Sequence, residues 1–104
     1  MRVLRDYCGV AIRLTDERRS HILEHPEMTG LEWAIDETLA NPEIVSESPA
    51  DETARLYYRY YVGTRVGDKF LCVVVKMEPD DAFVLTAYLT DRPKRGRLIW
   101  SATL

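Results

Sequence analysis

Residues 55–91 of this chain read RLYYRYYVGTRVGDKFLCVVVKMEPDDAFVLTAYLTD. The stretch contains three runs rich in β-branched and aromatic residues, separated by turn-forming residues near 63–68 and 78–81, and this pattern predicts three antiparallel strands. Cations and hydroxyls interrupt the apolar pattern at Arg55, Arg59, Lys76, Thr86 and Tyr88. Burying such groups without partners is costly. We therefore expect them to serve a function, and binding or cleaving an anionic backbone is one candidate.

The sequence before this stretch predicts two helices. Thr15 is a suitable N-cap for the first helix, which should end near His25 because Pro26 disfavours helical geometry in the residue before it. Thr29 and Glu32 match a capping box for the second helix, which should stop at Asn41-Pro42. One buried stripe is expected on the second helix, formed by Leu31, Ala34, Ile35, Thr38 and Leu39.

Short extended segments at 10–12, 43–46 and 98–100 are candidates for additional strands, and residues 92–97 form a basic loop. Helices that precede a meander of strands are typical of the α+β class. We predict a single domain over residues 1–104. Its two N-terminal helices should pack on one face of a roughly four-stranded antiparallel sheet, which leaves the other face for function.

Composition indicates an ordinary globular protein, because 46% of the 104 residues are hydrophobic and 30% are charged. No apolar run approaches the roughly 20 residues that a membrane helix needs, and the first ten residues lack the apolar segment of a secretory signal. The two cysteines, Cys8 and Cys72, have no metal-binding spacing and favour reduced thiols. We expect a cytoplasmic protein without a membrane partner.

Charge is distributed unevenly along the chain. The net charge of −3 does not by itself suggest a nucleic-acid-binding protein. Residues 1–54 hold 5 Lys and Arg against 12 Asp and Glu, whereas residues 55–104 hold 9 against 5. An acidic helical half joined to a basic strand half could steer an anion to one face, although acidic residues also simply favour solvated helix surfaces.

The parity of the last predicted hairpin groups several polar residues. If its turn is centred on Asp80, Lys76 lies opposite Val84, and directly opposed residues share a face of the sheet. The same register places Thr86 and Tyr88 on the Lys76 face. For the first hairpin the sequence leaves two alternatives. The residues that share the Lys76 face are either Arg55, Tyr57 and Arg59 or Leu56, Tyr58 and Tyr60.

The only two histidines, His21 and His25, are spaced i, i+4 on the first predicted helix and so lie on one side of it. Histidine titrates near neutral pH, and either residue could act as a general acid or base. No third metal ligand accompanies them, and the phosphate-binding glycine loop and the carboxylate cluster of two-metal nucleases are both missing. We expect neither a metal nor a cofactor.

Several short motifs occur in an order that resembles a nuclease family. They are RLTDERRSHILEHPEM at 13–28, ETLANPEIV at 37–45, RLYYRYY at 55–61, FLCVVVK at 70–76 and VLTAYLTD at 84–91. Over about residues 12–100 their order resembles the phage-associated nuclease-like domains grouped with barnase, EndoU, colicin-type tRNases and RelE toxins. The resemblance implies helices packed on a four-stranded antiparallel sheet, with RNA bound on the exposed sheet face. It also implies metal-free RNA cleavage that leaves a 2′,3′-cyclic phosphate.

The resemblance further implies roles for single residues. The helix histidine corresponds to His21, which would move the proton, while Lys76 and an arginine would hold the charge of the phosphorane. Which histidine and which arginine face the site stays open. The candidate catalytic residues are His21, Lys76, Thr86 and Arg55. The candidate substrate-binding residues are Arg59, Tyr57, Tyr88, His25 and Lys94.

The sequence therefore predicts a small, toxin-like, metal-independent endoribonuclease. RNA is its expected partner, and an antitoxin or immunity protein is a second one. Two alternatives remain at this point. The chain could be a non-catalytic module of the same fold that binds RNA or a protein, or it could be a homodimeric interaction protein.

Overall fold

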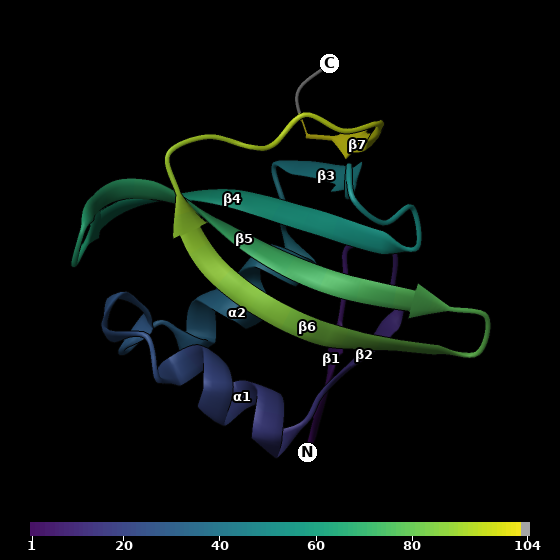
Figure 1. Ribbon diagram of the computed structural model, residues 1–104, viewed down its shortest axis with the longest axis horizontal. Coiled ribbons are helices and arrows are strands. Elements are labelled where there is room, and N and C mark those ends of the chain that lie inside the picture. Colours follow the sequence, from purple (N-terminus) through teal and green to yellow (C-terminus); the bar gives the residue numbers. More distant parts are fainter. Residues whose placement is uncertain (103–104) are drawn as a thin grey trace.

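The computed structural model describes residues 1–102. It contains the helices α1 (Asp16–Leu23) and α2 (Glu32–Ala40), with a short 3-10 helix at Pro26–Met28 between them. The strands are β1 (Arg2–Arg5), β2 (Ala11–Leu14), β3 (Ile44–Glu47), β4 (Ala54–Thr64), β5 (Gly67–Glu78), β6 (Asp81–Thr90) and β7 (Leu98–Ser101). The three long strands β4, β5 and β6 coincide with the runs in residues 55–91 and form the centre of the molecule (Figure 1).

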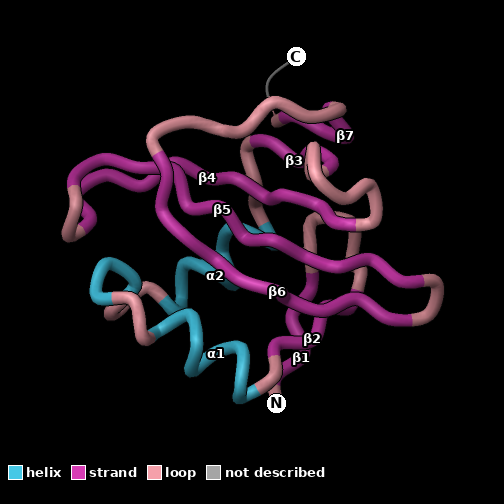
Figure 2. The backbone as a smooth tube through the Cα atoms, in the orientation of Figure 1, coloured by secondary structure: helices cyan, strands magenta, loops and turns pink. Residues whose placement is uncertain are grey.

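The prediction of a roughly four-stranded antiparallel sheet was wrong, although the α+β class holds. The sheet has seven strands in the order β1-β2-β6-β5-β4-β3-β7, and it is mixed because β2 pairs with β6 in parallel. Four strands of four residues each, β1, β2, β3 and β7, extend the central meander on both sides (Figure 2). The extended segments expected at 10–12, 43–46 and 98–100 correspond to β2, β3 and β7, whereas β1 was not expected. The neighbours of β2 and β7 in the sheet include strands that lie far away in the sequence.

The parallel pairing of β2 with β6 illustrates this long-range effect. Arg13 of β2 lies in register with Phe83 of β6, with its guanidinium 5.5 Å from the centre of the phenyl ring. Arg13 also donates two hydrogen bonds to the Asp81 carboxylate, from Nε at 2.8 Å and from Nη2 at 2.7 Å. A bidentate pair of this kind fixes orientation as well as distance. The contact with Asp81 alone spans 68 positions of the sequence, which no local pattern can show.

The helices partly follow the prediction. The Thr15 hydroxyl accepts a hydrogen bond from the Arg18 amide at 3.2 Å, which confirms the N-cap of α1. The capping box was wrong, because α2 begins at Glu32 after Leu31 and has no side-chain cap. Gly30, with a φ of 80°, redirects the chain after the 3-10 helix, so Thr29 lies too early to cap α2. The predicted stripe is confirmed at Ala34, Ile35, Thr38 and Leu39, which are buried.

The sheet curls until its two ends meet. Tyr7, which follows β1, packs against Trp100 of β7 with a ring-centroid distance of 4.6 Å. Beneath this contact the Tyr57 hydroxyl donates a hydrogen bond to the Asp6 carboxylate at 2.7 Å. The main core lies inside the curl, where α2 covers the inner face of the sheet (Figures 1 and 2). None of the helices within residues 1–102 is long and apolar enough to cross a membrane.

Loss of the Tyr57 hydroxyl is expected to destabilise the fold. Tyr57→Phe keeps the ring but removes one of the donors to Asp6, a carboxylate that is only 5% exposed. A hydrogen bond to a charged group contributes about 1.5–3 kcal/mol, so the free energy of unfolding should fall by about that amount. Urea denaturation measures it. Tyr60→Phe, at a ring 43% exposed, is the matched control and should change stability by less than about 0.5 kcal/mol. Equal effects of the two substitutions would contradict the assignment.

Candidate functional site

The outward side of β4, β5 and β6 is the face of the sheet that α2 does not cover (Figure 1). We call it the open face. Strand pairing places on it the set Leu56, Tyr58, Tyr60, Phe70, Cys72, Val74, Lys76, Thr86 and Tyr88. The neighbouring residues Val73, Val75 and Val84 point the other way, into the main core. Three of the predicted polar residues, Lys76, Thr86 and Tyr88, therefore share one face.

The register of this hairpin differs in one detail from the expectation. Val74 lies opposite Thr86 and Cys72 lies opposite Tyr88, as expected. Lys76 lies opposite Phe83 rather than Val84, because the pairing shifts by one residue between Val74 and Val75. The irregularity adds one residue to β6, so it moves the contact of Lys76 along the strand without moving Lys76 to the other face.

The structure resolves the alternative for β4 in favour of Leu56, Tyr58 and Tyr60. Arg55, Tyr57 and Arg59 point to the inner side, opposite Val75, Val73 and Leu71 respectively. The predicted catalytic set is thus divided between the two faces of the sheet, with Arg55 separated from Lys76 and Thr86.

The inward residues of β4 are buried in the core, engaged by other side chains or located at a separate pocket. Tyr57 is fully buried. Arg59 interacts with the Glu37 carboxylate at 3.3 Å and donates to the carbonyl of Asn41 at 2.9 Å. Arg55 lines a pocket near the end of the strand. These three side chains are therefore not available to a ligand on the open face.

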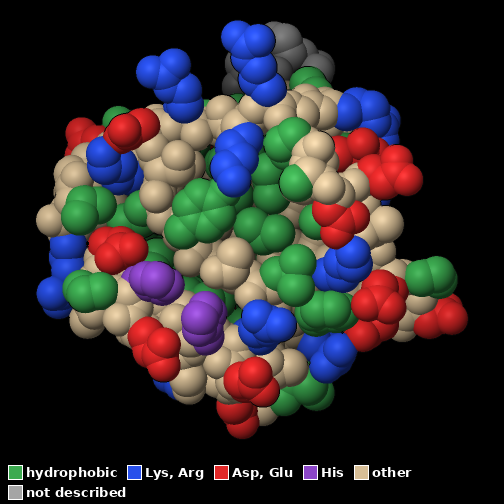
Figure 3. Space-filling view, in the orientation of Figure 1, with side chains coloured by type: hydrophobic (Ala, Val, Ile, Leu, Met, Phe, Trp, Pro, Cys, Tyr) green, Lys and Arg blue, Asp and Glu red, His purple; other side chains and the backbone are tan. Residues whose placement is uncertain are grey.

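The centre of the open face is apolar and closely packed (Figure 3). Leu56, Tyr58 and Cys72 are buried there, and burial raises the pKa of the Cys72 thiol to about 11. Burial also raises the pKa of Tyr88, to which the adjacent Cys72 thiol contributes. The Tyr88 hydroxyl is a buried group without a hydrogen-bond partner of ordinary geometry within residues 1–102. A group in this condition is a suitable donor to a ligand.

The basic loop at 92–97 borders the same face. The Lys94 amide donates to the Tyr58 hydroxyl at 3.0 Å, and the Lys94 ammonium lies 5.5 Å from the centre of the Tyr88 ring. Gly96 fixes this path, because a Cβ at that position would stand 2.3 Å from the carbonyl oxygen of Glu47. The loop thereby holds an exposed cation over the Tyr88 ring.

Both histidines flank the open face, as the purple side chains in Figure 3 show. His21 lies in the last turn of α1, and His25 follows the helix at the N-cap of the short 3-10 helix. The rings of His21 and His25 lie 6.0 Å apart and are about half exposed. Arg18 precedes them on the same side of the helix and reaches β6, where it donates to the carbonyl of Leu85 at 3.5 Å. Sequence reasoning missed Arg18, although the spacing i, i+3, i+7 from Arg18 to His25 was a readable signal.

Lys76 is held by a neighbour from outside the strands. Its ammonium lies 2.6 Å from the Asp51 carboxylate, in the loop that precedes β4. The hydrogen bond from Lys76, together with those from Thr53, lowers the pKa of Asp51 to about 2. At neutral pH the carboxylate is therefore ionised, and a phosphate must compete with it for Lys76.

Taken together, the open face offers two imidazoles, three cations and two hydroxyls around an apolar centre. The cations are Arg18, Lys76 and Lys94, and the hydroxyls are those of Thr86 and Tyr88. Imidazoles can transfer protons, cations can stabilise an anion, and exposed rings such as Tyr60 can stack on a base. Among residues 1–102, no group of three or more His, Cys, Asp or Glu side chains is placed to hold a metal ion.

Comparison with known proteins finds no matching family model, no matching curated protein and no matching solved structure. The geometry described above is therefore the basis on which a function is proposed.

The pairing of Lys76 with Asp51 gives a testable pKa. Lys76→Met removes the largest cause of the lowered Asp51 pKa, whereas the hydrogen bonds from Thr53 remain. The pKa should rise from about 2 toward, but not reach, the ordinary value of 3.8. Because the carboxylate is stabilised in the folded state, its contribution to stability is present above pH 3.8 and is lost as the pH falls toward 2 in the wild type.

Carboxyl-carbon NMR titration of the wild type and the variant measures this difference directly. Lys69→Met removes the lysine partner of Asp91 and serves as the matched control, since it should leave the Asp51 titration unchanged. An Asp51 pKa that stays near 2 in Lys76→Met would show that Lys76 does not hold the carboxylate in solution.

Proposed function

We propose that this protein binds single-stranded RNA on its open face and cleaves it without a metal ion. The observation that carries the proposal is the position of both histidines beside the one face that groups Lys76, Thr86, Tyr88 and Lys94. Metal-free RNA cleavage requires proton transfer and stabilisation of a phosphorane, and these side chains are the types that supply both.

In the proposed reaction the ribose 2′-oxygen forms a bond to the adjacent phosphorus, and the bond from phosphorus to the 5′-oxygen of the next nucleotide breaks. A neutral His21 accepts the proton of the 2′-hydroxyl. A protonated His25 donates a proton to the departing 5′-oxygen. The products are a 2′,3′-cyclic phosphate and a free 5′-hydroxyl, and the two histidines exchange protonation states.

The cations around the face take different parts in the proposal. Lys94 is exposed and carries no ion pair within the described residues, so it can reach a phosphate directly. Arg18 takes the place that Arg55 was expected to fill, because Arg55 points to the other side of β4. Lys76 can bind a phosphate of the RNA only when that phosphate displaces the Asp51 carboxylate from its ammonium group.

Binding would rest on stacking as well as charge. Tyr60 is 43% exposed, and its ring meets Phe70 edge-on with a centroid distance of 5.0 Å. A base that stacks on such a ring gains roughly 1–3 kcal/mol without regard to its identity. The proposal places the protein in the cytoplasm, where RNA is accessible, and a toxin-like ribonuclease there would need an antitoxin or immunity protein as its inhibitor.

The test is incubation of purified protein with a tRNA pool and total RNA in EDTA. We expect the wild type to cleave and to leave cyclic-phosphate ends. His21→Ala and His25→Ala should each lower the rate on the order of a hundredfold or more, because each removes one proton transfer. Lys94→Ala should also lower it, since a cation near the phosphorane is lost. Arg65→Ala, an exposed arginine at the tip of the β4–β5 hairpin, is the matched control and should retain wild-type activity.

Several outcomes would count against cleavage on this face. RNA left intact by the wild type, but bound with an affinity that falls steeply with salt, would indicate a binding module. Intact RNA without binding, together with a concentration-dependent mass, would instead favour an interaction protein. Cleavage that survives in the His21→Ala, His25→Ala double variant would place the reaction elsewhere on the molecule.

A further inference from the structure

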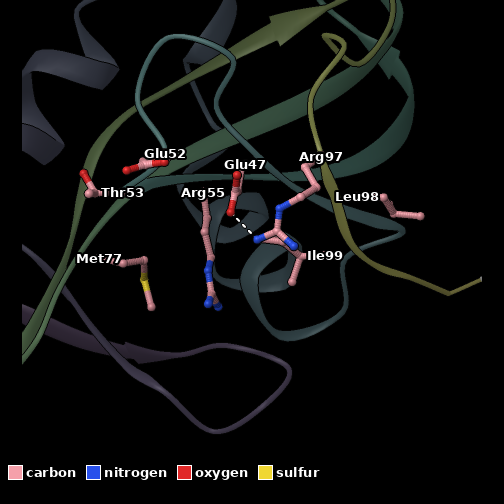
Figure 4. Close-up of a pocket in the computed structure, with 8 residues that line it drawn as sticks. All are labelled: Glu47, Glu52, Thr53, Arg55, Met77, Arg97, Leu98 and Ile99. Carbon is pink, nitrogen blue, oxygen red and sulfur yellow. Dashed lines mark hydrogen bonds and ion pairs between the residues drawn. The ribbon is translucent and has the colours of Figure 1, made fainter.

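A second site lies on the other side of β4, away from the open face. A pocket of about 400 Å³ opens where the ends of the curled sheet meet. It is formed by β4, β5 and β7, by Glu47 at the end of β3 and by the loops before β4 and β7 (Figure 4). Its volume is in the range of small-molecule sites. The lining residues are Glu47, Glu52, Thr53, Arg55, Met77, Arg97, Leu98 and Ile99.

Arg55 is the distinctive residue of this pocket. Its side chain is half-buried, and Figure 4 shows it extending between Met77 on one side and Ile99 on the other. No carboxylate within residues 1–102 forms an ion pair with it, whereas Arg13, Arg59 and Arg97 each have one. Removing a guanidinium from water without an anionic partner is unfavourable, and an anion in the pocket would relieve that cost.

The nearby carboxylates are already engaged or point elsewhere. Glu47 is bound by Arg97, an ion pair that also lowers the pKa of Glu47. Asp6, deeper in the molecule, accepts hydrogen bonds from the Tyr57 hydroxyl and from the amides of Cys8 and Val10. Glu52 is exposed at the rim. The positive charge of Arg55 is thus the one left for a ligand, while the surrounding acids disfavour a ligand with more than one negative charge.

The remaining wall is apolar. Met77, Leu98 and Ile99 line the pocket beside the Arg55 guanidinium, and Leu98 is 58% exposed at its edge. A ligand that matches this lining carries a single negative charge and a short apolar chain. Its charged group is planar, so that it can accept two parallel hydrogen bonds from the guanidinium. A carboxylate has that geometry.

We propose that the Arg55 pocket binds a small organic acid, with its carboxylate on Arg55 and its apolar chain against Met77 and Ile99. This site is independent of RNA cleavage on the open face, because consecutive residues of β4 point to opposite sides of the sheet. Binding at one site can therefore be measured while the other is empty.

The experiment is an NMR titration of the protein with sodium butyrate at neutral pH. We expect saturable shifts at the Met77 methyl, the Ile99 methyls and the Arg55 Nε–H. Butyramide has the same shape without the charge and should bind at least about tenfold more weakly, since it lacks the ion pair. Inorganic phosphate should also bind more weakly than butyrate.

Two variants locate the site. Arg55→Gln should weaken butyrate binding about tenfold or more, and its amide spectrum reports whether the fold is retained. Leu98→Glu adds a negative charge at an exposed position on the rim, where unfolding is not expected, and should weaken binding as well. Arg65→Gln removes a distant arginine and should leave binding unchanged.

Equal binding of butyrate and butyramide would overturn the assignment of a carboxylate, and tighter binding of phosphate would replace it by a phosphate site. The absence of saturable shifts in the wild type would refute the site itself. The outcome does not depend on the RNA assay, because butyrate should leave RNA cleavage unchanged and Arg55→Gln should weaken butyrate binding whether or not RNA is cleaved.

Discussion

The buried carboxylate of Asp6 is the constraint on which the arrangement of this protein depends. It is 5% exposed and accepts hydrogen bonds from the Tyr57 hydroxyl at 2.7 Å and from the amides of Cys8 and Val10 at 2.9 Å. These bonds connect the β1–β2 turn to the centre of β4, across 51 residues of sequence. A buried charge has to be fully satisfied, so the turn and the strand must be held together. The curl of the sheet, and the meeting of Tyr7 with Trp100 above it, follow from that connection.

The same interaction decides which side chains reach each face. With Tyr57 committed to the interior, strand alternation turns Arg55 and Arg59 inward and Tyr58 and Tyr60 outward. A core hydrogen bond thus separates Arg55 from Lys76, although sequence motifs had suggested a common site for them. It also places a half-buried arginine at the pocket where the ends of the sheet meet.

How much of this could be predicted depended on whether the signal was local. The limits of α2 at Asn41-Pro42, the three long strands and the common face of Lys76, Thr86 and Tyr88 all follow from residues close in sequence. The side of β4 that faces the core could not be predicted, because RLYYRYY places tyrosines on both sides of the strand. The set without charges, Leu56, Tyr58 and Tyr60, faces outward, and the set that contains two arginines faces inward. Of the short outer strands, β2, β3 and β7 coincide with the extended segments expected at 10–12, 43–46 and 98–100, and only β1 was missed. The parallel pairing of β2 with β6 could not be predicted, since contacts such as Arg13 with Asp81 and Phe83 come from distant parts of the chain.

The acidic and basic halves of the sequence lie on different parts of the folded molecule. Helix α2 lies behind the sheet in Figure 1, and several of its acidic side chains form ion pairs with arginines. Glu32 binds Arg2 and Arg19, Asp36 binds Arg2, and Glu37 binds Arg59.

These pairs neutralise negative charge on the side away from the open face, whereas Arg18, Lys76 and Lys94 border the open face at different points. Exposed charges interact strongly only within about 10 Å at moderate ionic strength, so the charges nearest to a ligand count for more than the net charge of −3. A chain that is acidic overall can for this reason present a face suited to an anionic strand. The Asp51 carboxylate weakens this attraction, because it forms an ion pair with Lys76, one of the three cations, and a phosphate would have to displace it.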